Sequence, residues 1–263
     1  MKYVLIDIAK GSTESLELSP SEAEVLNNEL FNRSHALKSD FALIPEEIYN
    51  TPKKLAIFDM DSTLIQEEVI VQIAKENGTG GKVKEITNEA MEGKLDFTQS
   101  LVRRVALLEG FPKEKMQEVF NTLNLSAGIV PLFKIMQAKG IKTAIASGGF
   151  TFFAHQFQNQ LRIDDVYAND LEFKNDKLSG KVQGEIVDAE RKRQIVHELA
   201  KKYNLGLNEI MTVGDGANDI PMLLEVGLGV AVHAKRTVQE KVKYRLNYSD
   251  MMALLPLMNI KNV

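Results

Sequence analysis

From residue 130 to the C-terminus, short apolar runs alternate with longer segments in which apolar residues recur at helical spacing. The short runs predict buried strands, and the helical spacing predicts amphipathic helices. Strands are expected at 141–146, 210–213 and 228–232, and helices through Phe133 and Met136, through Phe153 and Phe157, and over 189–203. This alternation predicts an α/β fold: a doubly wound, Rossmann-like parallel sheet with its ligand site at the carboxyl ends of the strands.

Two excursions are expected from this core. The apolar run Leu55–Phe58 predicts its first strand, and helical spacing between residues 64 and 128 predicts a helical unit inserted after that strand. Residues 166–186 are predicted to form a short β-hairpin around a turn at 174–177. We therefore expect an α/β core over 51–66 and 126–263, with a helical insert over 67–125.

Residues 1–50 carry no constellation of catalytic side chains. Strands are expected at 3–8 and 15–18, followed by a helix that begins at Ser19 and runs to about Phe31. Two roles stay open for this N-terminal segment, a small binding module or a purely structural packing unit.

Composition and charge narrow the class of protein. The 263 residues carry a net charge of −4 and no long Lys/Arg run, which disfavours nucleic acid and anionic membranes as partners. Because cysteine is absent, disulfides, thiol nucleophiles and zinc–thiolate sites are excluded. The first apolar run is broken at Asp7, too early for a signal peptide or a membrane-spanning helix. The expected compartment is the cytoplasm.

Polar clusters follow three of the predicted strands. They are Asp59-Met60-Asp61-Ser62-Thr63, Ser147-Gly148-Gly149 and Gly214-Asp215-Gly216-Ala217-Asn218-Asp219. Because parallel strands present their carboxyl ends at one edge of a sheet, the three clusters are expected to form one site.

The chemistry of these clusters suits a cation beside an anion. Asp59 and Asp61 project to the same side, and their carboxylates repel unless a cation lies between them or one is protonated. Together with Asp215 they offer the oxygen ligands that Mg²⁺ prefers. Ser147-Gly148-Gly149 offers a hydroxyl and backbone N–H groups to an anion, although most Ser-Gly-Gly segments are simple turns.

Two basic side chains are placed on inward faces by helical spacing. Lys192 shares its face with Ile195 and Leu199, whereas most helix lysines are solvated. Arg104 shares its face with Leu101 and Leu108, and neighbouring Arg103 is turned about 100° away. An inward arginine requires an anion, and its guanidinium suits a carboxylate. Glu68 taken alone is indistinguishable from a surface glutamate.

These segments together resemble the haloacid dehalogenase (HAD) superfamily and, within it, the phosphoserine phosphatases. The resemblance runs from about residue 55 to 255 and adds Gln66-Glu67-Glu68, the cap segment from Ala90 to Phe97, and Ala146 to Phe150. Two positions depart from the family pattern. Val102 replaces the first of two usual arginines, which leaves Arg104 as the match and the role of Arg103 open, and Arg236 stands where proline is usual.

The resemblance implies Mg²⁺-dependent hydrolysis of O-phospho-L-serine, the last step of serine biosynthesis, through an aspartyl-phosphate. It implies Asp59 as nucleophile and Asp61 as general acid and base. Mg²⁺ would be held by the side chains of Asp59 and Asp215 and the carbonyl of Asp61, with Asp219 behind these ligands. Substrate-binding roles are implied for the phosphoryl group at Ser147, Gly148, Lys192 and Asn218, for the ammonium at Glu68 and for the carboxylate at Arg104.

Other functions remain possible at this stage. A related phosphatase for phosphothreonine or phosphohomoserine would use the same residues. A phospho-acceptor signalling module also carries an acidic cluster, a hydroxyl and a lysine, but it lacks a cap and a second aspartate two residues after the acceptor. The oligomeric state is left open by the sequence.

Overall fold

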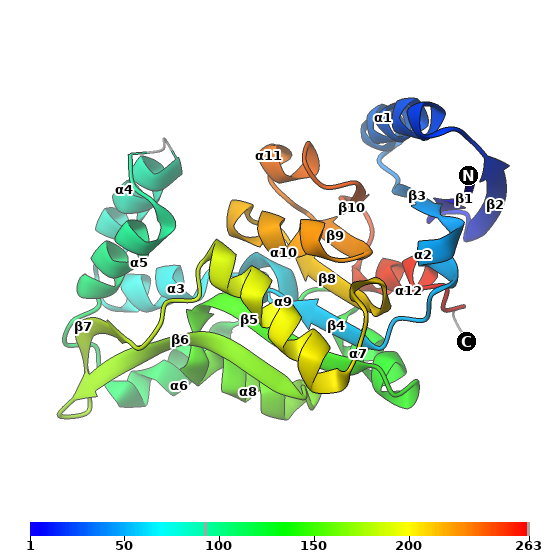
Figure 1. Cartoon of the computed structure of the whole chain (residues 1–263). Helices are drawn as coiled ribbons and strands as arrows, with labels where there is room; N and C mark the ends of the chain where they lie inside the picture. The colour runs from blue at the N-terminus through cyan, green and yellow to red at the C-terminus, as the bar shows by residue number, and fades with distance from the viewer. Residues whose placement is uncertain (92–93, 262–263) are drawn as a thin grey trace.

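The computed structural model describes residues 1–91 and 94–261. Its centre is a seven-stranded sheet in the order β10-β9-β8-β4-β5-β6-β7, which is parallel except for β7 (Figure 1). The strands are β4 (Leu55–Phe58), β5 (Lys142–Phe150), β6 (Asp165–Lys174), β7 (Lys177–Gln183), β8 (Ile210–Gly214), β9 (Leu228–Val232) and β10 (Tyr244–Leu246). The predicted doubly wound fold is confirmed.

Strand β4 shows why the sheet needs helices on both faces. Ala56 and Phe58 belong to one buried apolar cluster, whereas Leu55 and Ile57 belong to another on the opposite face. Side chains alternate along a strand, so a run without polar residues is stable only between two covering layers. One layer contains α7 (Ile129–Ala138) and α8 (Thr151–Leu161), and the other contains α9 (Ala189–Tyr203) and α10 (Ile220–Glu225).

The helical insert comprises α3 (Val69–Glu76), α4 (Gly80–Met91), α5 (Phe97–Ala106) and α6 (Lys113–Thr122). The two chain segments that connect the insert to the core are hydrogen-bonded to each other. Ile65 pairs with Leu125, and Gln66 N–H donates to the Asn124 carbonyl at 2.9 Å. Helix α6 packs near α8 through Phe120 and Phe157, whose ring centroids are 4.9 Å apart. Helices α4 and α5 project furthest from the sheet (Figure 1). Glu92 and Gly93 of the cap motif lie outside the described residues.

The β6–β7 hairpin supports the insert. Gly110 N–H donates to the Leu178 carbonyl at 2.8 Å, and Leu178 N–H donates to the Phe111 carbonyl at 2.9 Å. The sequence predicted the hairpin, and the structure adds that it extends the core sheet to the base of α5 and α6.

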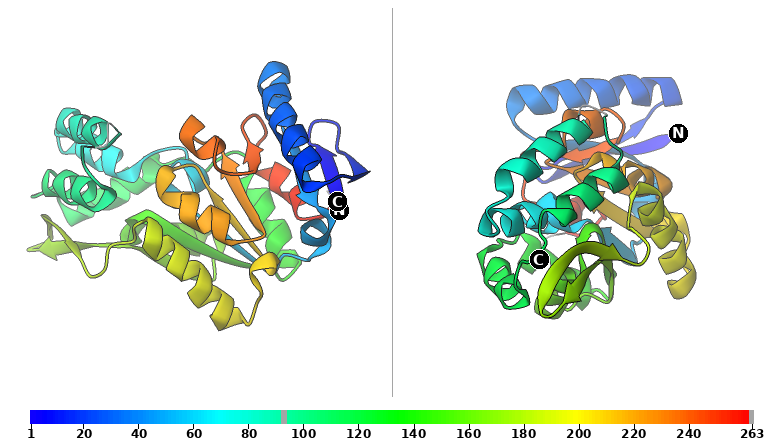
Figure 2. Two further views of the ribbon diagram at one scale, coloured as in Figure 1. Left: turned by 45° about the horizontal axis from the view of Figure 1, so that its top comes forward. Right: turned by 90° about the vertical axis from the view of Figure 1, so that its left-hand side faces the viewer.

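The N-terminal residues form a separate three-stranded antiparallel sheet, in the order β2-β1-β3, covered by one helix. Its elements are β1 (Lys2–Asp7), β2 (Ser12–Glu17), α1 (Pro20–Leu37), β3 (Phe41–Pro45) and α2 (Glu46–Asn50). This unit lies at the opposite end of the molecule from α4 and α5 (Figure 2). It is fixed to the core by Asp40, whose buried carboxylate accepts the backbone N–H groups of Asn247, Tyr248 and Ser249 at 2.7–2.9 Å.

The structure corrects several predicted boundaries. Helix α1 continues past Phe31 to Leu37, because polar residues on its outer face do not end a helix, and it stops where Lys38 adopts a left-handed conformation. Strand β5 continues past Ala146 to Phe150, and strands β3 and β10 were not expected. The chain closes with α11 (Arg236–Gln239) and α12 (Leu254–Leu257). No helix within 1–91 or 94–261 is long and apolar enough to cross a bilayer.

Candidate active site

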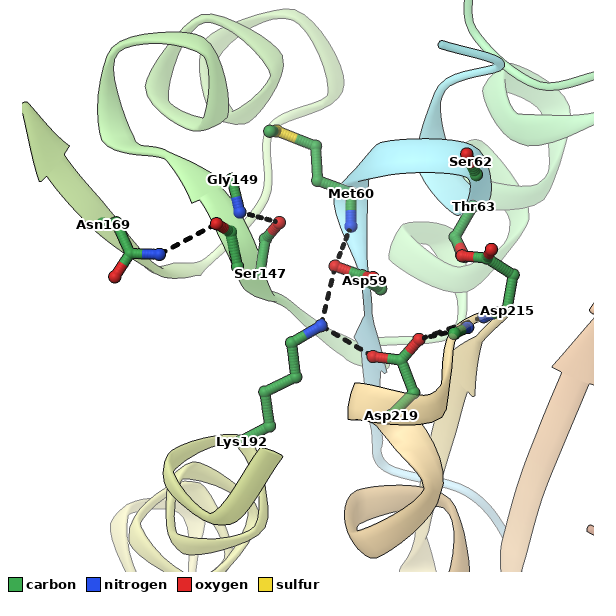
Figure 3. Close-up of polar contacts among 12 residues, drawn as sticks. Asp59, Met60, Ser62, Thr63, Ser147, Gly149, Asn169, Lys192, Asp215 and Asp219 are labelled. Carbon is green, nitrogen blue, oxygen red and sulfur yellow. Dashed lines mark hydrogen bonds and ion pairs between the residues drawn. The ribbon is translucent and has the colours of Figure 1, made fainter. Parts of the chain in front are cut away.

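The three polar clusters meet at one edge of the sheet, as predicted. Strand β4 lies between β5 and β8, and Phe58 at its end is level with Ile145 on one side and Val213 on the other. The residues that follow these strands therefore converge (Figure 3). This is the crevice at the carboxyl ends of the strands where doubly wound folds bind ligands.

Asp59 is held at the end of β4 with one of its two carboxylate oxygens engaged. Its backbone N–H donates to the Val213 carbonyl at 2.9 Å. Oδ1 accepts the Met60 N–H at 2.7 Å and lies 2.9 Å from Lys192 Nζ. Within the described part of the chain, Oδ2 has no hydrogen-bond partner, so it is available to a ligand.

Lys192 is fully buried and contacts two carboxylates. Its ammonium lies 2.9 Å from Asp59 Oδ1 and 2.6 Å from Asp219 Oδ1 (Figure 3). Burial alone would lower the pKa of Lys192, but Asp219 and Asp59 outweigh it and hold the pKa above its usual value. The lysine is therefore a permanent cation, and the sequence prediction that it faces inward is confirmed.

Asp61 lies in a tight turn beside Asp59. Ser62, the next residue, has a φ of 56°, a left-handed conformation that few non-glycine residues adopt. Asp61 Oδ1 is buried and has no hydrogen-bond partner among the described residues. Burial, followed by the charges of Glu68 and Asp59, raises the pKa of Asp61 well above its usual range. A protonated carboxyl group at this position can donate its proton to a leaving oxygen.

Asp215 follows β8 and faces Asp59. Thr63 Oγ1 donates to Asp215 Oδ1 at 3.1 Å and orients the carboxylate (Figure 3). Burial, followed by the charges of Asp59, Asp219 and Glu68, raises the pKa of Asp215 to about 8. Such a carboxylate is destabilised by its neighbours and gains most from a cation.

Asp219 has a different position in the site. Its Oδ2 accepts the N–H groups of Asp215 and Gly216, at 3.1 and 2.8 Å, while Oδ1 contacts Lys192. Burial and the Asp59 charge raise the pKa of Asp219 to about 6, although Lys192 opposes the shift. Since both oxygens are engaged by the protein, Asp219 orders the loop and the lysine.

These carboxylates could hold a metal ion. Oxygen atoms of Asp59, Asp215 and Asp219 lie within 4.8 Å of one another. The carboxylate of Asp61 is outside that group, which is compatible with the expectation that this residue would contribute its backbone carbonyl. Asp215 and Asp219 have raised pKa values beside Asp59, and hard oxygen donors of this kind fit a hard divalent cation.

The Ser147–Gly149 segment closes the site on the β5 side. Ser147 is fully buried, and its Oγ accepts the Gly149 N–H at 2.9 Å. A Cβ atom on Gly148 would lie 2.6 Å from Phe97 Cζ, and one on Gly149 would lie 2.6 Å from Met60 Cε. The two glycines therefore allow the core loop to approach both α5 and the turn after β4.

Glu68 and Arg104 place opposite charges above the site. Glu68 precedes α3 and accepts from Ser62 Oγ at 3.3 Å. Arg104 lies on α5, where burial lowers the pKa of its guanidinium while Glu68 and Asp61 partly restore it. In the described ranges Arg104 has no ion-pair partner within 4.0 Å, whereas Arg103 points outward to Glu89 at 3.6 Å.

Two residues that hold the site together, Thr63 and Asn169, had no individual role predicted from the sequence. Thr63 was quoted within the first cluster, and its link to Asp215 spans 152 positions, which no local pattern reveals. Asn169, on β6, donates to the Gly148 carbonyl at 2.8 Å. The only feature of the sequence that could have indicated this role is a polar amide within a predicted strand.

Asn218, predicted to bind the phosphoryl group, lies on the loop after β8 and is half-buried.

Comparison with known proteins identifies the family. The sequence profile of haloacid dehalogenase-like hydrolases matches residues 53–227. The phosphoserine phosphatase of Haemophilus influenzae is 41% identical over 226 residues, which cover 86% of this chain and 72% of that protein. The chain belongs to the haloacid dehalogenase-like hydrolases, within the phosphoserine phosphatases.

Further relatives in this family extend the match. The phosphoserine phosphatase of Archaeoglobus fulgidus is 33% identical over 93% of this chain and 71% of that protein, so the match extends into the N-terminal unit. The crystal structure of a HAD family hydrolase from Salmonella enterica serovar Typhi covers all of both chains at 31% identity, with a TM-score of 0.88. A phosphoserine phosphatase solved as an analogue of its phospho-aspartyl intermediate covers 80% of this chain at 39% identity, with a TM-score of 0.74.

Proposed function

We propose that the chain hydrolyses O-phospho-L-serine to L-serine and phosphate, the last step of serine biosynthesis, through an aspartyl-phosphate on Asp59. The main support for this proposal is the arrangement of charges in the site. The buried Lys192 lies in the carboxylate cluster where the phosphate would react, and Glu68 and Arg104 lie above that cluster. This pattern complements a molecule with a phosphate, an ammonium and a carboxylate. The relatives described above support the same assignment.

In the first step, an oxygen of Asp59 attacks phosphorus while the bond to the serine oxygen breaks. Asp61, protonated because its pKa is raised, gives its proton to the departing serine oxygen. In the second step, Asp61 takes a proton from water, which attacks the aspartyl-phosphate and releases inorganic phosphate. General acid–base catalysis of this kind contributes roughly 10²- to 10⁴-fold to the rate.

Charge on the phosphoryl oxygens is stabilised by four groups in this proposal: the Ser147 hydroxyl, the Gly148 N–H, the Lys192 ammonium and the Asn218 amide. Donors aimed at developing charge in a water-excluded site contribute strongly to rate. Glu68 would bind the substrate ammonium, and Arg104 its carboxylate.

We propose Mg²⁺ as the cation, held by the side chains of Asp59 and Asp215 and the carbonyl of Asp61. The cation would neutralise the phosphoryl charge and the mutual repulsion of the carboxylates. Asp219, which already accepts backbone N–H groups and contacts Lys192, would hold the loop that carries Asp215 in place without being a ligand itself.

We also propose the division of the chain into a core over 51–66 and 126–263, a cap over 67–125 and an N-terminal unit over 1–50. The close approach of Phe97 to Gly148 supports this division, because it brings α5 against the Ser147–Gly149 segment. A cap in this position would exclude water during phosphoryl transfer. The cytoplasmic location stays a prediction.

The decisive test is the release of phosphate from a panel of phosphomonoesters: phosphoserine, phosphothreonine, phosphohomoserine and p-nitrophenyl phosphate. We expect phosphoserine to have the highest kcat/KM, with activity lost in EDTA and restored by Mg²⁺ but not by Ca²⁺, which prefers more ligands at longer distances. A higher kcat/KM for phosphothreonine would reassign the substrate. A stable phosphoprotein without turnover would favour a signalling module.

A further inference from the structure

We propose that Asn169 is a positioning residue that directs the Ser147 hydroxyl toward the phosphoryl group, acting through the peptide between Gly148 and Gly149. The inference rests on the proposed function, because it explains how Ser147 is prepared for the role given to it there.

The phosphate-binding loop lies where β5 leaves its ladder with β6. Ala146 pairs with Tyr167 and Phe150 pairs with Asn169, and the register shifts between the two pairs. Such an irregularity takes backbone groups out of the ladder. The carbonyl of Gly148 therefore needs a partner from elsewhere, since an unpaired polar group in a buried loop is costly.

The Asn169 side chain is that partner. It is fully buried, and its Nδ2 donates to the Gly148 carbonyl at 2.8 Å (Figure 3). Its Oδ1 accepts the Val187 N–H at 2.8 Å. The amide orientation follows from these partners, because a carbonyl only accepts and a backbone N–H only donates. Val187 immediately precedes Asp188, the N-cap of α9. One amide thus ties the loop to the helix that carries Lys192.

The peptide transmits this contact to Ser147. In a trans peptide the Gly148 carbonyl and the Gly149 N–H point in opposite directions within one plane. A fixed carbonyl therefore fixes the N–H, which donates to Ser147 Oγ at 2.9 Å. Since Oγ accepts this bond, the hydroxyl proton of Ser147 remains available to a phosphoryl oxygen. Linked hydrogen bonds of this kind strengthen one another.

An amide is the side chain that can do this. Leucine has a similar volume but leaves both backbone groups unpaired. A carboxylate keeps the bond to Val187 and loses the donor to Gly148. Asn169→Asp therefore removes only the contact with the loop, whereas Asn169→Leu removes the contacts with both the loop and the segment before α9.

The experiment is a double-mutant cycle between Asn169 and Ser147, with kcat and KM measured on phosphoserine in Mg²⁺. Asn169→Leu and Asn169→Asp are each made alone and with Ser147→Ala, and Asp170→Asn is the control, an amide–carboxylate exchange at the exposed neighbour on β6. We expect each Asn169 change to lower kcat about tenfold, which is less than the roughly 10²- to 10³-fold lost when a transition-state donor is removed, because the hydroxyl is still present but misplaced. KM should change little, and the loss should fall below twofold when Ser147 is already alanine.

Several outcomes would overturn the inference. An equal loss in the Ser147→Ala background would show that Asn169 acts independently of the hydroxyl. Failure of both Asn169 variants to fold, checked by thermal unfolding, would make the residue a determinant of the fold rather than of positioning. If the wild-type protein did not hydrolyse phosphoserine, the proposed function would fail by itself. The same cycle would then be run on binding of inorganic phosphate, where loss of the coupling would still contradict the inference.

Discussion

The ammonium of Lys192 lies 2.9 Å from Oδ1 of Asp59, so the proposed nucleophile is paired with a buried cation before any ligand binds. Because Lys192 also contacts Asp219, this single positive charge partly offsets the negative charges of two carboxylates. The arrangement leaves the second Asp59 oxygen available for ligands. It also makes the site sensitive to loss of the lysine.

We expect Lys192→Met to lower kcat by at least a hundredfold and to destabilise the fold. Removing one partner of a buried ion pair leaves an uncompensated charge, at a cost of about 3–5 kcal/mol. The measurements are phosphate release and the free energy of unfolding in urea. Lys201→Met, an exposed position on the same helix, is the control. A Lys192→Met protein as stable as wild type would contradict this account of the cluster.

Asp59→Asn should abolish turnover and keep the fold. The amide is isosteric, and its oxygen can still accept from the Met60 N–H and Lys192, but it is not nucleophilic. Activity is followed by phosphate release and folding by thermal unfolding. More than a trace of activity in the folded variant would rule out the covalent intermediate.

Arg104→Ala should weaken the reaction with phosphoserine and spare phosphoethanolamine, which has the ammonium but no carboxylate. Loss of a charge-assisted contact of about 1.5–3 kcal/mol corresponds to roughly ten- to a hundredfold in kcat/KM. Arg103→Ala, whose side chain points to Glu89 on the surface, should change neither substrate. Glu68→Gln should impair both substrates. Equal losses on both substrates for Arg104→Ala would assign that arginine to the cap or the phosphate.

The metal-free protein should become less stable as the pH rises toward 8. Asp215 has a pKa of about 8 when folded, against an ordinary value of 3.8, so the folded state binds more protons between these limits. An excess of protons on the folded state means that stability falls as the pH rises through that window.

Mg²⁺ should therefore raise the melting temperature more at pH 8 than at pH 5, because the cation replaces a bound proton. Thermal unfolding with EDTA or Mg²⁺ at both pH values measures the difference. Asp215→Asn should reduce both the pH dependence in EDTA and the increment from Mg²⁺. The same increment at both pH values would refute a metal site built on this carboxyl group.

The sequence by itself determined those strands and helices that show a clear pattern of apolar residues within their own length. An apolar run buried on both faces predicted β4, and helical spacing placed Lys192 on the inward face of α9. Since polar clusters followed three such strands, convergence at one edge followed from the parallel arrangement. Strand β10 escaped prediction because its three residues are too few to show a pattern. Strand β3 makes its ladder with β1, from which β2 and α1 separate it in the chain.

Only the tertiary structure decided which side chains meet. Lys192 and Asp219 are 27 positions apart, and Thr63 and Asp215 are 152 positions apart, so these contacts depend on how separate strands are aligned. The bond from Asn169 to Gly148 exists because β5 leaves the ladder beside β6, a feature of the pair of strands and not of either one. The periodicity of apolar residues predicts which side chains are buried. It does not predict which buried groups form hydrogen bonds with each other, because long-range packing sets the positions of the partners.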